Sequence, residues 1–261
     1  MPLLLLAVVA MLIQQTMATA AKTTVPVLFP AMAPALGVAS EAVLVYTWIF
    51  SCMGMAVMAG CGTFIIRYGA IRISQVGGLL MATGLGFAAL AGLGSPVGLV
   101  MVILGALLIS AGSTSATPAS SEILARYAPA KLSPLIFSIK QTGVPAGIAI
   151  AGALILPLSA WIGWQQALFV VAGTCLLIAV GLASCRATFD RDRRPAQKLA
   201  FGDLKETLLS VWGQPALRAM ALAAFVFVML RPRKAASLPG EDGPIPSPPT
   251  HRLQSALSAR Q

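Results

Sequence analysis

The side chains best suited to binding a ligand are a few polar residues inside long apolar runs. Gln15, Thr19 and Lys22 follow one another at offsets of four and three, so in a helix they share one face, about one turn apart. If that helix runs on to Pro26, the ammonium of Lys22 lines a cavity and favours an anionic ligand. The alternative is a Lys22 at the membrane interface, extending its ammonium into water.

Ser113 and Thr117 form a second polar group, inside another apolar run. Polar side chains are costly in lipid, so within a span they are expected to face a cavity or a neighbouring helix. The amide of Gln15 would serve equally well as a hydrogen-bonding group between helices. The hydroxyls of Ser113 and Thr117 either face a cavity or bond back to carbonyls of their own helix.

The residues that carry most enzyme chemistry are scarce. The single histidine, His251, lies in the polar C-terminal region, so a histidine-based triad inside the apolar body is excluded. The sequence has no phosphate-binding glycine loop. Its four cysteines form no CxxC pair. These cysteines are Cys52, Cys61, Cys175 and Cys185. We therefore expect a protein that is not an enzyme, with no catalytic residue, no metal and no cofactor.

The composition is typical of a membrane protein. Hydrophobic residues make up 57% of the chain and charged residues 10%, against about 25% charged residues in ordinary soluble domains. The mean hydropathy is +0.85. The net charge of +10 comes from short basic segments between apolar runs, not from one basic helical face, so no nucleic-acid partner is expected.

Six apolar runs have about the 20 residues needed to cross a bilayer. They predict an all-α membrane protein, a six-transmembrane-helix bundle. The first run ends in Ala18-Thr19-Ala20, which imitates a signal-peptide cleavage site, but no basic segment precedes it and more spans follow. The spans are Leu3 to Ala21, Val43 to Ile66, Ile73 to Leu93, Val97 to Ser120, Leu135 to Leu158 and Gln166 to Ser184.

The basic residues predict the orientation of the spans. Connections two, four and six carry nearly all of them, and the opposite side has only Lys22. Short basic connections stay in the cytoplasm, so the N-terminus is expected there, in a multi-pass protein of the cell (inner) membrane. The residues counted on the basic side are Arg67, Arg72, Arg126, Lys131, Lys140, Arg186, Arg191, Arg193, Arg194, Lys198, Lys205 and Arg218.

The segment GTFIIRYGAIR resembles the signature loop between helices two and three of the major facilitator superfamily. It matches that loop at Gly62, Arg67, Gly69 and Arg72, and departs from it at Ile66. The family usually has an acidic residue at that position, which helps to latch the two halves of the transporter. With six spans and a long basic loop after the sixth, the chain resembles the N-terminal half of such a transporter.

The segment KQTGVPAGIAIAG resembles the glycine-and-proline motif of the family's fifth helix. Gly143, Gly147 and Ala151 fall four residues apart on one face, and Gly152 follows them. Pro145 frees a backbone carbonyl. The resemblance implies that this face packs against the other half and permits rocking between inward and outward states. Tight packing within one bundle would use the same small residues.

Membership of this family implies transport of a small solute by alternating access, with substrate bound at mid-membrane between two six-helix halves. The polar residues Gln15, Thr19, Lys22, Ser113 and Thr117 are then candidates for the substrate pathway. The implied partners are the lipid bilayer, a small-molecule substrate and a coupling proton or other ion. The alternatives are a non-transporting structural or assembly subunit, and a half-transporter that pairs with a second chain.

Four regions are expected along the chain. Residues 1–184 form the six-helix bundle, 185–218 a cytoplasmic basic linker, 219–230 a partial seventh helix, and 231–261 a disordered, proline-rich tail. A family member would continue through further helices. We therefore expect a chain truncated by a frameshift, with impaired or no activity alone, or else a natural half-transporter.

Overall fold

The structure is a computed structural model that describes residues 2–93, 96–190, 213–215, 218–220 and 222–223. The chain divides into two units, Met1–Leu204 and Lys205–Gln261, and the first holds all the elements described below. Every regular element in the described residues is helical. The predicted partial seventh helix at 219–230 lies mostly outside those residues, and the predicted tail at 231–261 lies wholly outside them.

Six helical segments follow one another along the first unit. Each is long and apolar enough to cross a membrane, which confirms the predicted all-α fold with six spans. A helix satisfies all its backbone groups internally, as lipid requires. The elements are α1 (Pro2–Leu36), η1 (Ser40–Ala42), α2 (Val43–Tyr68), α3 (Ala70–Ala89), η2 (Leu90–Leu93), α4 (Val97–Tyr127), α5 (Ser133–Gln141), α6 (Gly143–Ile150), η3 (Ala151–Ile155), α7 (Leu156–Ile162), α8 (Trp164–Gly181) and α9 (Ala183–Phe189).

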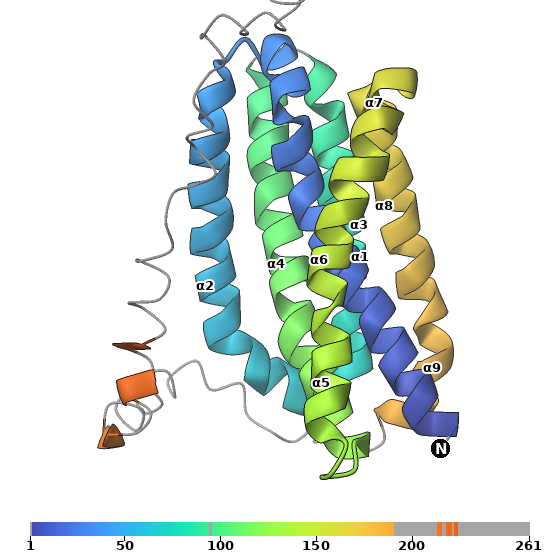
Figure 1. The fold of residues 1–261 in the computed structure, drawn as a ribbon. Helices are drawn as coiled ribbons and strands as arrows, with labels where there is room; N and C mark the ends of the chain where they lie inside the picture. The colour runs from blue at the N-terminus through green and yellow to red at the C-terminus, as the bar shows by residue number, and fades with distance from the viewer. Residues whose placement is uncertain (1, 94–95, 191–212, 216–217, 221, 224–261) are drawn as a thin grey trace, which may run out of the picture. The chain divides into compact units, whose positions relative to one another are not determined.

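The first helix is much longer than the predicted span of Leu3 to Ala21. It continues to Leu36, with Pro26, Pro30 and Pro34 inside it. Each proline lacks an N–H, but in a membrane helix neighbouring helices and threonine hydroxyls compensate for the lost bond. Figure 1 shows α1 crossing the bundle obliquely. Lys22 therefore lies inside a helix and not in a connection, which corrects its place in the charge count.

The fifth span is a rod of four pieces. α5 ends at Gln141 and α6 begins at Gly143, and η3 is a π-helical turn before α7. Pro157, which follows η3, has no N–H to give to the carbonyl one turn back, so the regular α-helical ladder is interrupted there. The pieces are nearly in line in Figure 1.

Glycines bring α3 and α4 into close contact. A Cβ on Gly84 would lie 2.8 Å from the carbonyl oxygen of Gly105, and a Cβ on Gly77 would lie 2.8 Å from that of Gly112. Each pair is seven residues, or about two turns, from the other on both helices. The two antiparallel backbones therefore touch along a stripe where no larger side chain fits.

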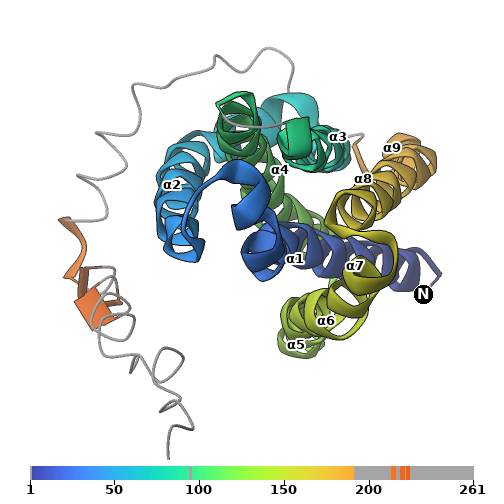
Figure 2. The same ribbon diagram turned by 90° about the horizontal axis from the view of Figure 1, so that it is seen from above.

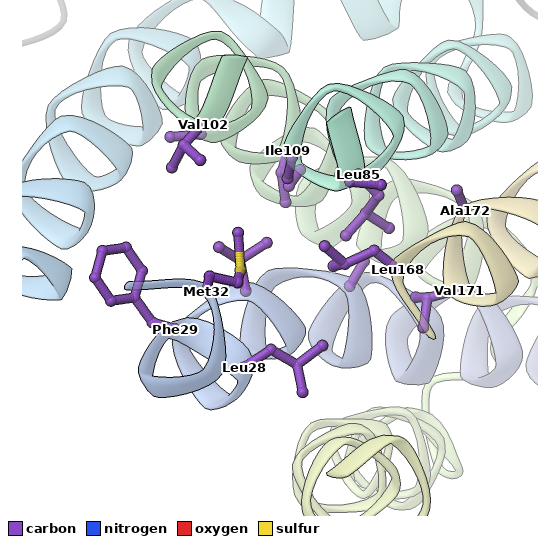
Figure 3. Packing of buried hydrophobic residues seen from close by; sticks show 14 of the residues in the cluster. Leu28, Phe29, Met32, Leu85, Val102, Ile109, Leu168, Val171 and Ala172 are labelled. Atoms are coloured by element: carbon purple, nitrogen blue, oxygen red, sulfur yellow. The ribbon is translucent and has the colours of Figure 1, made fainter. Parts of the chain in front are cut away.

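The apolar core surrounds α1, which lies at the centre of the bundle in the view along it (Figure 2). Figure 3 shows Met32 of α1 on the side of Ile109 of α4, Leu85 of α3 and Leu168 of α8, and Leu28 on the opposite side of α1. All five side chains are buried. Packing around α1 thus joins helices that are far apart in the sequence.

Two segments are covered far less than the rest. Only 17% of the most apolar window is buried in the span that contains α2, and 22% in the span of α5 to α7, whereas the value is 44% in those of α3 and α4. Ser110 of α4 donates a hydrogen bond of 2.6 Å to the carbonyl of Phe50, which ties α2 to the bundle. The outer faces of α2 and the fifth span are therefore left for lipid or another helix.

Candidate functional site

Polar groups from α1, α4 and α5 meet inside the bundle, at a place we call the inner polar cluster: Gln15, Thr117, Ser121 and Lys140. The hydroxyl of Thr117 lies 3.5 Å from Oε1 of Gln15 and donates to it. Gln15 is buried, and Thr117 is half-buried. Two of the predicted pathway residues are thus brought together across the contact between α1 and α4.

Lys140 completes this cluster from α5. Its ammonium donates to the carbonyl oxygen of Thr117 at 3.0 Å and to Oγ of Ser121 at 2.7 Å. The Ser121 hydroxyl in turn donates to the Thr117 carbonyl at 2.9 Å. Lys140 is only 2% exposed. The sequence analysis counted Lys140 among the basic residues of a connection, and the structure corrects this because the residue is buried in a membrane span.

The sequence did contain a signal for this position. Lys140 falls inside the predicted span Leu135 to Leu158, and apolar residues precede and follow it. A charged residue within a span is rare and usually functional. Counting it with the connection concealed that signal. Ser121 was missed because its partner, 19 residues away on the next span, cannot be identified from spacing alone.

Lys22 lies apart from this cluster, on the same face of α1 as Gln15 but two turns further along. Its side chain is exposed, whereas Ala18 and Val25, one turn away on either side, are buried. Leu5 and Val9 of α1 are exposed, large and apolar. At about 100° per residue they lie on a different face of the helix from Lys22, so Lys22 is exposed apart from that apolar face.

Thr19 and Ser113 are buried and bond within their own helices. The hydroxyl of Thr19 donates to the Gln15 carbonyl at 3.0 Å, and that of Ser113 to the Ser110 carbonyl at 3.4 Å. Back-bonding was one of the two interpretations considered for Ser113, and this geometry matches it. Neither hydroxyl joins the inner polar cluster in this arrangement.

The turn between α2 and α3 is held by a carboxylate from far along the chain. Asp190, directly after α9, accepts hydrogen bonds of 3.0 Å from the backbone N–H groups of Ile71 and Arg72. Both N–H groups belong to the first turn of α3, where they have no acceptor within their own helix and carry the partial positive charge of a helix N-terminus. The signature loop lacks an acidic residue at Ile66, and Asp190 brings one to the same turn.

Gly69 is the single residue that connects α2 to α3. Its φ of +95° is a left-handed conformation that favours glycine. A Cβ there would also collide with the carboxylate of Asp190. Arg67 stacks its guanidinium 5.5 Å from the Tyr68 ring centroid, and Arg72 is exposed. The expected basic turn thus becomes the ends of two helices joined by one glycine.

The glycines of the two motifs lie in different surroundings. A Cβ on Gly143 would lie 3.0 Å from Oγ1 of Thr16, and one on Gly147 would lie 2.7 Å from Cβ of Thr19, so both pack against α1 of the same bundle. This geometry matches tight packing within one bundle, which was one of the two interpretations of that face. Gly62 and Gly152 have open space around them, and Pro145 is exposed.

Two of the cavities between the described helices are apolar. One of about 330 Å³ lies between α2, α3 and α4, and its lining includes Met53, Phe64 and Leu80. One of about 220 Å³ lies between α1, α2 and α4. Among the described residues, no group of histidine, cysteine, aspartate and glutamate could hold a metal ion. The inner polar cluster and Lys22, not these cavities, are therefore the candidate site for a polar solute.

Six apolar helices, a one-glycine turn between the second and third, and a buried polar cluster between helices describe a multi-pass membrane protein. The chain belongs to the Major Facilitator Superfamily, whose family model matches residues 10–232. That family consists of transporters. None of the curated proteins compared with the chain matches it.

Proposed function

We propose that this chain supplies the N-terminal six-helix half of a secondary transporter that moves a small anionic solute by alternating access, coupled to a proton or another ion. The observation that carries the proposal is Lys22. α1 continues for 14 residues beyond it, about 21 Å at 1.5 Å per residue, so Lys22 is far from either end of the helix. A cation at the middle of the bilayer costs roughly 2.5 to 3.5 kcal/mol on insertion scales, so we infer that Lys22 faces a polar path.

The two motifs are proposed to provide the conformational change. The turn at Gly69 connects two rigid helices, and the breaks in the fifth span divide it into pieces that can shift against one another. Under this proposal, the outer faces of α2 and the fifth span meet the second half. The proposed conformational residues are Gly62, Arg67, Gly69, Arg72, Gly143, Pro145, Gly147 and Gly152.

The proposal is tested by binding of radiolabelled acetate, malonate and benzoate to proteoliposomes that contain the full chain, because one half carries Lys22 but need not complete transport alone. We expect binding of at least one anion, retained in Lys22→Arg and lost in Lys22→Gln. Lys131→Gln is the matched control, because Lys131 is exposed in the connection between α4 and α5. Binding that is equal in Lys22→Gln and the wild type would contradict the assignment of Lys22.

A half-transporter that pairs with itself is the second candidate, and the open outer face of α2 favours it. Cys52 lies on that helix, is exposed and is a free thiol. If two copies pair through α2, mild oxidation of membranes should crosslink them through Cys52. The variant Cys52→Ser is the control, and a chain that stays monomeric under oxidation would argue against pairing through this face.

A further inference from the structure

We propose that Lys140 is a second anion-binding residue of the transport pathway, which takes the carboxylate of a small organic anion in the part of the bundle occupied by the inner polar cluster. The inference rests on the proposed function, since it assumes that the chain carries an anion past Lys22. It adds a site whose member on α1, Gln15, lies two turns from Lys22. It also gives a role to Lys140, which begins the glycine-and-proline segment but was counted with a connection.

The bonds of Lys140 leave its charge unbalanced. The ammonium has three N–H groups, and its two acceptors, the Thr117 carbonyl and the Ser121 hydroxyl, are both neutral. Among the described residues, no carboxylate forms an ion pair with it. The acidic residue next to Ser121 on α4, Glu122, is 42% exposed and pairs with Arg126 at 2.8 Å. A buried cation of this kind is expected to acquire an anionic partner.

Neutral acceptors make the site exchangeable. Hydrogen bonds between an ammonium and a carboxylate are roughly twice as strong as those between neutral groups. An arriving carboxylate would therefore displace the Ser121 hydroxyl, which keeps its own bond to the Thr117 carbonyl. The lysine is poised for an anion, and not locked in a permanent ion pair that an anion would have to break.

The cluster also lies on the same path as Lys22. Gln15, which bonds to Thr117, precedes Lys22 by seven residues on α1. Seven residues bring the side chains back to the same face, about 10 Å apart along the axis. Lys22 thus shares a face of α1 with Gln15, and Lys140 bonds the same Thr117 that Gln15 contacts. Under the proposal, an anion that leaves one of these cations is received by the other.

The segment that carries Lys140 is suited to opening the site. Thr142 joins α5 to α6 with helical backbone angles, but Pro145 has no N–H to give to the carbonyl of Gln141 one turn back, so the helical ladder is weakened directly after Lys140. The two bonds from Lys140 to α4 hold α5 against that helix. When a carboxylate takes over the ammonium, those bonds are released, which couples occupancy of the site to movement of α5.

The test measures binding to the purified full chain by titration calorimetry, with sodium acetate, malonate and benzoate and with the corresponding neutral amides as probes. Loss of a charged hydrogen bond in Lys140→Gln should weaken carboxylate binding by about 10- to 100-fold. Lys140→Arg should retain binding. Ser121→Ala removes the competing acceptor and should bind carboxylates more tightly than the wild type, a gain that a merely structural role for Lys140 does not predict.

The outcomes separate this inference from the proposed function. If Lys22→Gln loses carboxylate binding while Lys140→Gln and Ser121→Ala both bind as the wild type does, the function stands and the role of Lys140 is wrong. If the wild type binds none of the carboxylates, both are wrong. Should Lys140→Gln fail to fold, Ser121→Ala and Lys140→Arg decide the matter, because unchanged affinity in the former together with loss in the latter would overturn the inference.

Discussion

Asp190 shows how one side chain can define where a membrane helix begins. Its carboxylate accepts two backbone N–H groups of α3, so Asp190→Ala should leave both without a partner in a buried turn. Loss of a helix cap costs about 0.5 to 2 kcal/mol, and we expect a lower midpoint of thermal unfolding in detergent. Glu41→Ala is the control, because Glu41 is exposed and caps no helix. A midpoint equal to that of the control would show that the cap contributes nothing.

At the same scale, the sequence predicted some contacts and missed others for a clear reason. The shared face of Gln15, Thr19 and Lys22 follows from helical spacing within one span, and all three lie in α1. The bond from Asp190 to Ile71 joins residues 119 positions apart, and no local pattern encodes such a pairing. Residues that act across helices could be named as polar, but their partners could not be assigned.

Among the elements, α3 and α4 depend on glycine at their contact. In Gly84→Ala the new methyl would lie 2.8 Å from the Gly105 carbonyl, so the helices must separate, at a cost of about 1 to 3 kcal/mol. Gly86→Ala is a control on the same helix, where a Cβ meets nothing within 4 Å. Its higher helix propensity should leave stability unchanged or raise it by up to about 1 kcal/mol. Equal unfolding midpoints for the two variants would contradict the close contact.

The boundaries of the elements were predicted less well than their number. Six runs of sufficient length predicted six spans, because the hydrocarbon thickness sets the length of a crossing helix. The first span was predicted to end at Ala21, with continuation of the helix to Pro26 as an alternative, whereas α1 ends at Leu36. Proline rules derived from helices in water place a break at Pro26 to Pro34, whereas in lipid an irregular backbone is more costly than a helix that contains prolines.

For the whole molecule, the packing of the helices explains why the fifth-helix motif could not be interpreted from sequence alone. Gly143 and Gly147 are spaced like a face that meets another half, yet both pack on α1 within this one. Small residues permit close approach to any helix, so spacing identifies a contact but not its partner. The bonds that buried Lys140 makes to α4 are likewise apparent only once α4 and α5 are placed side by side.

The orientation of the whole molecule provides the last prediction. In a chain with Cys52→Ser, we expect a cysteine at Lys131 to react with a membrane-impermeant maleimide only after cells are permeabilised, and one at Ala39 to react in intact cells. Both positions are exposed, in the connections that follow α4 and α1. With Lys22 and Lys140 inside helices, Arg67, Arg72, Arg126 and Lys131 still lie on one side, and short basic connections remain cytoplasmic. The reverse labelling pattern would invert the molecule and place the inner polar cluster nearer the outer surface.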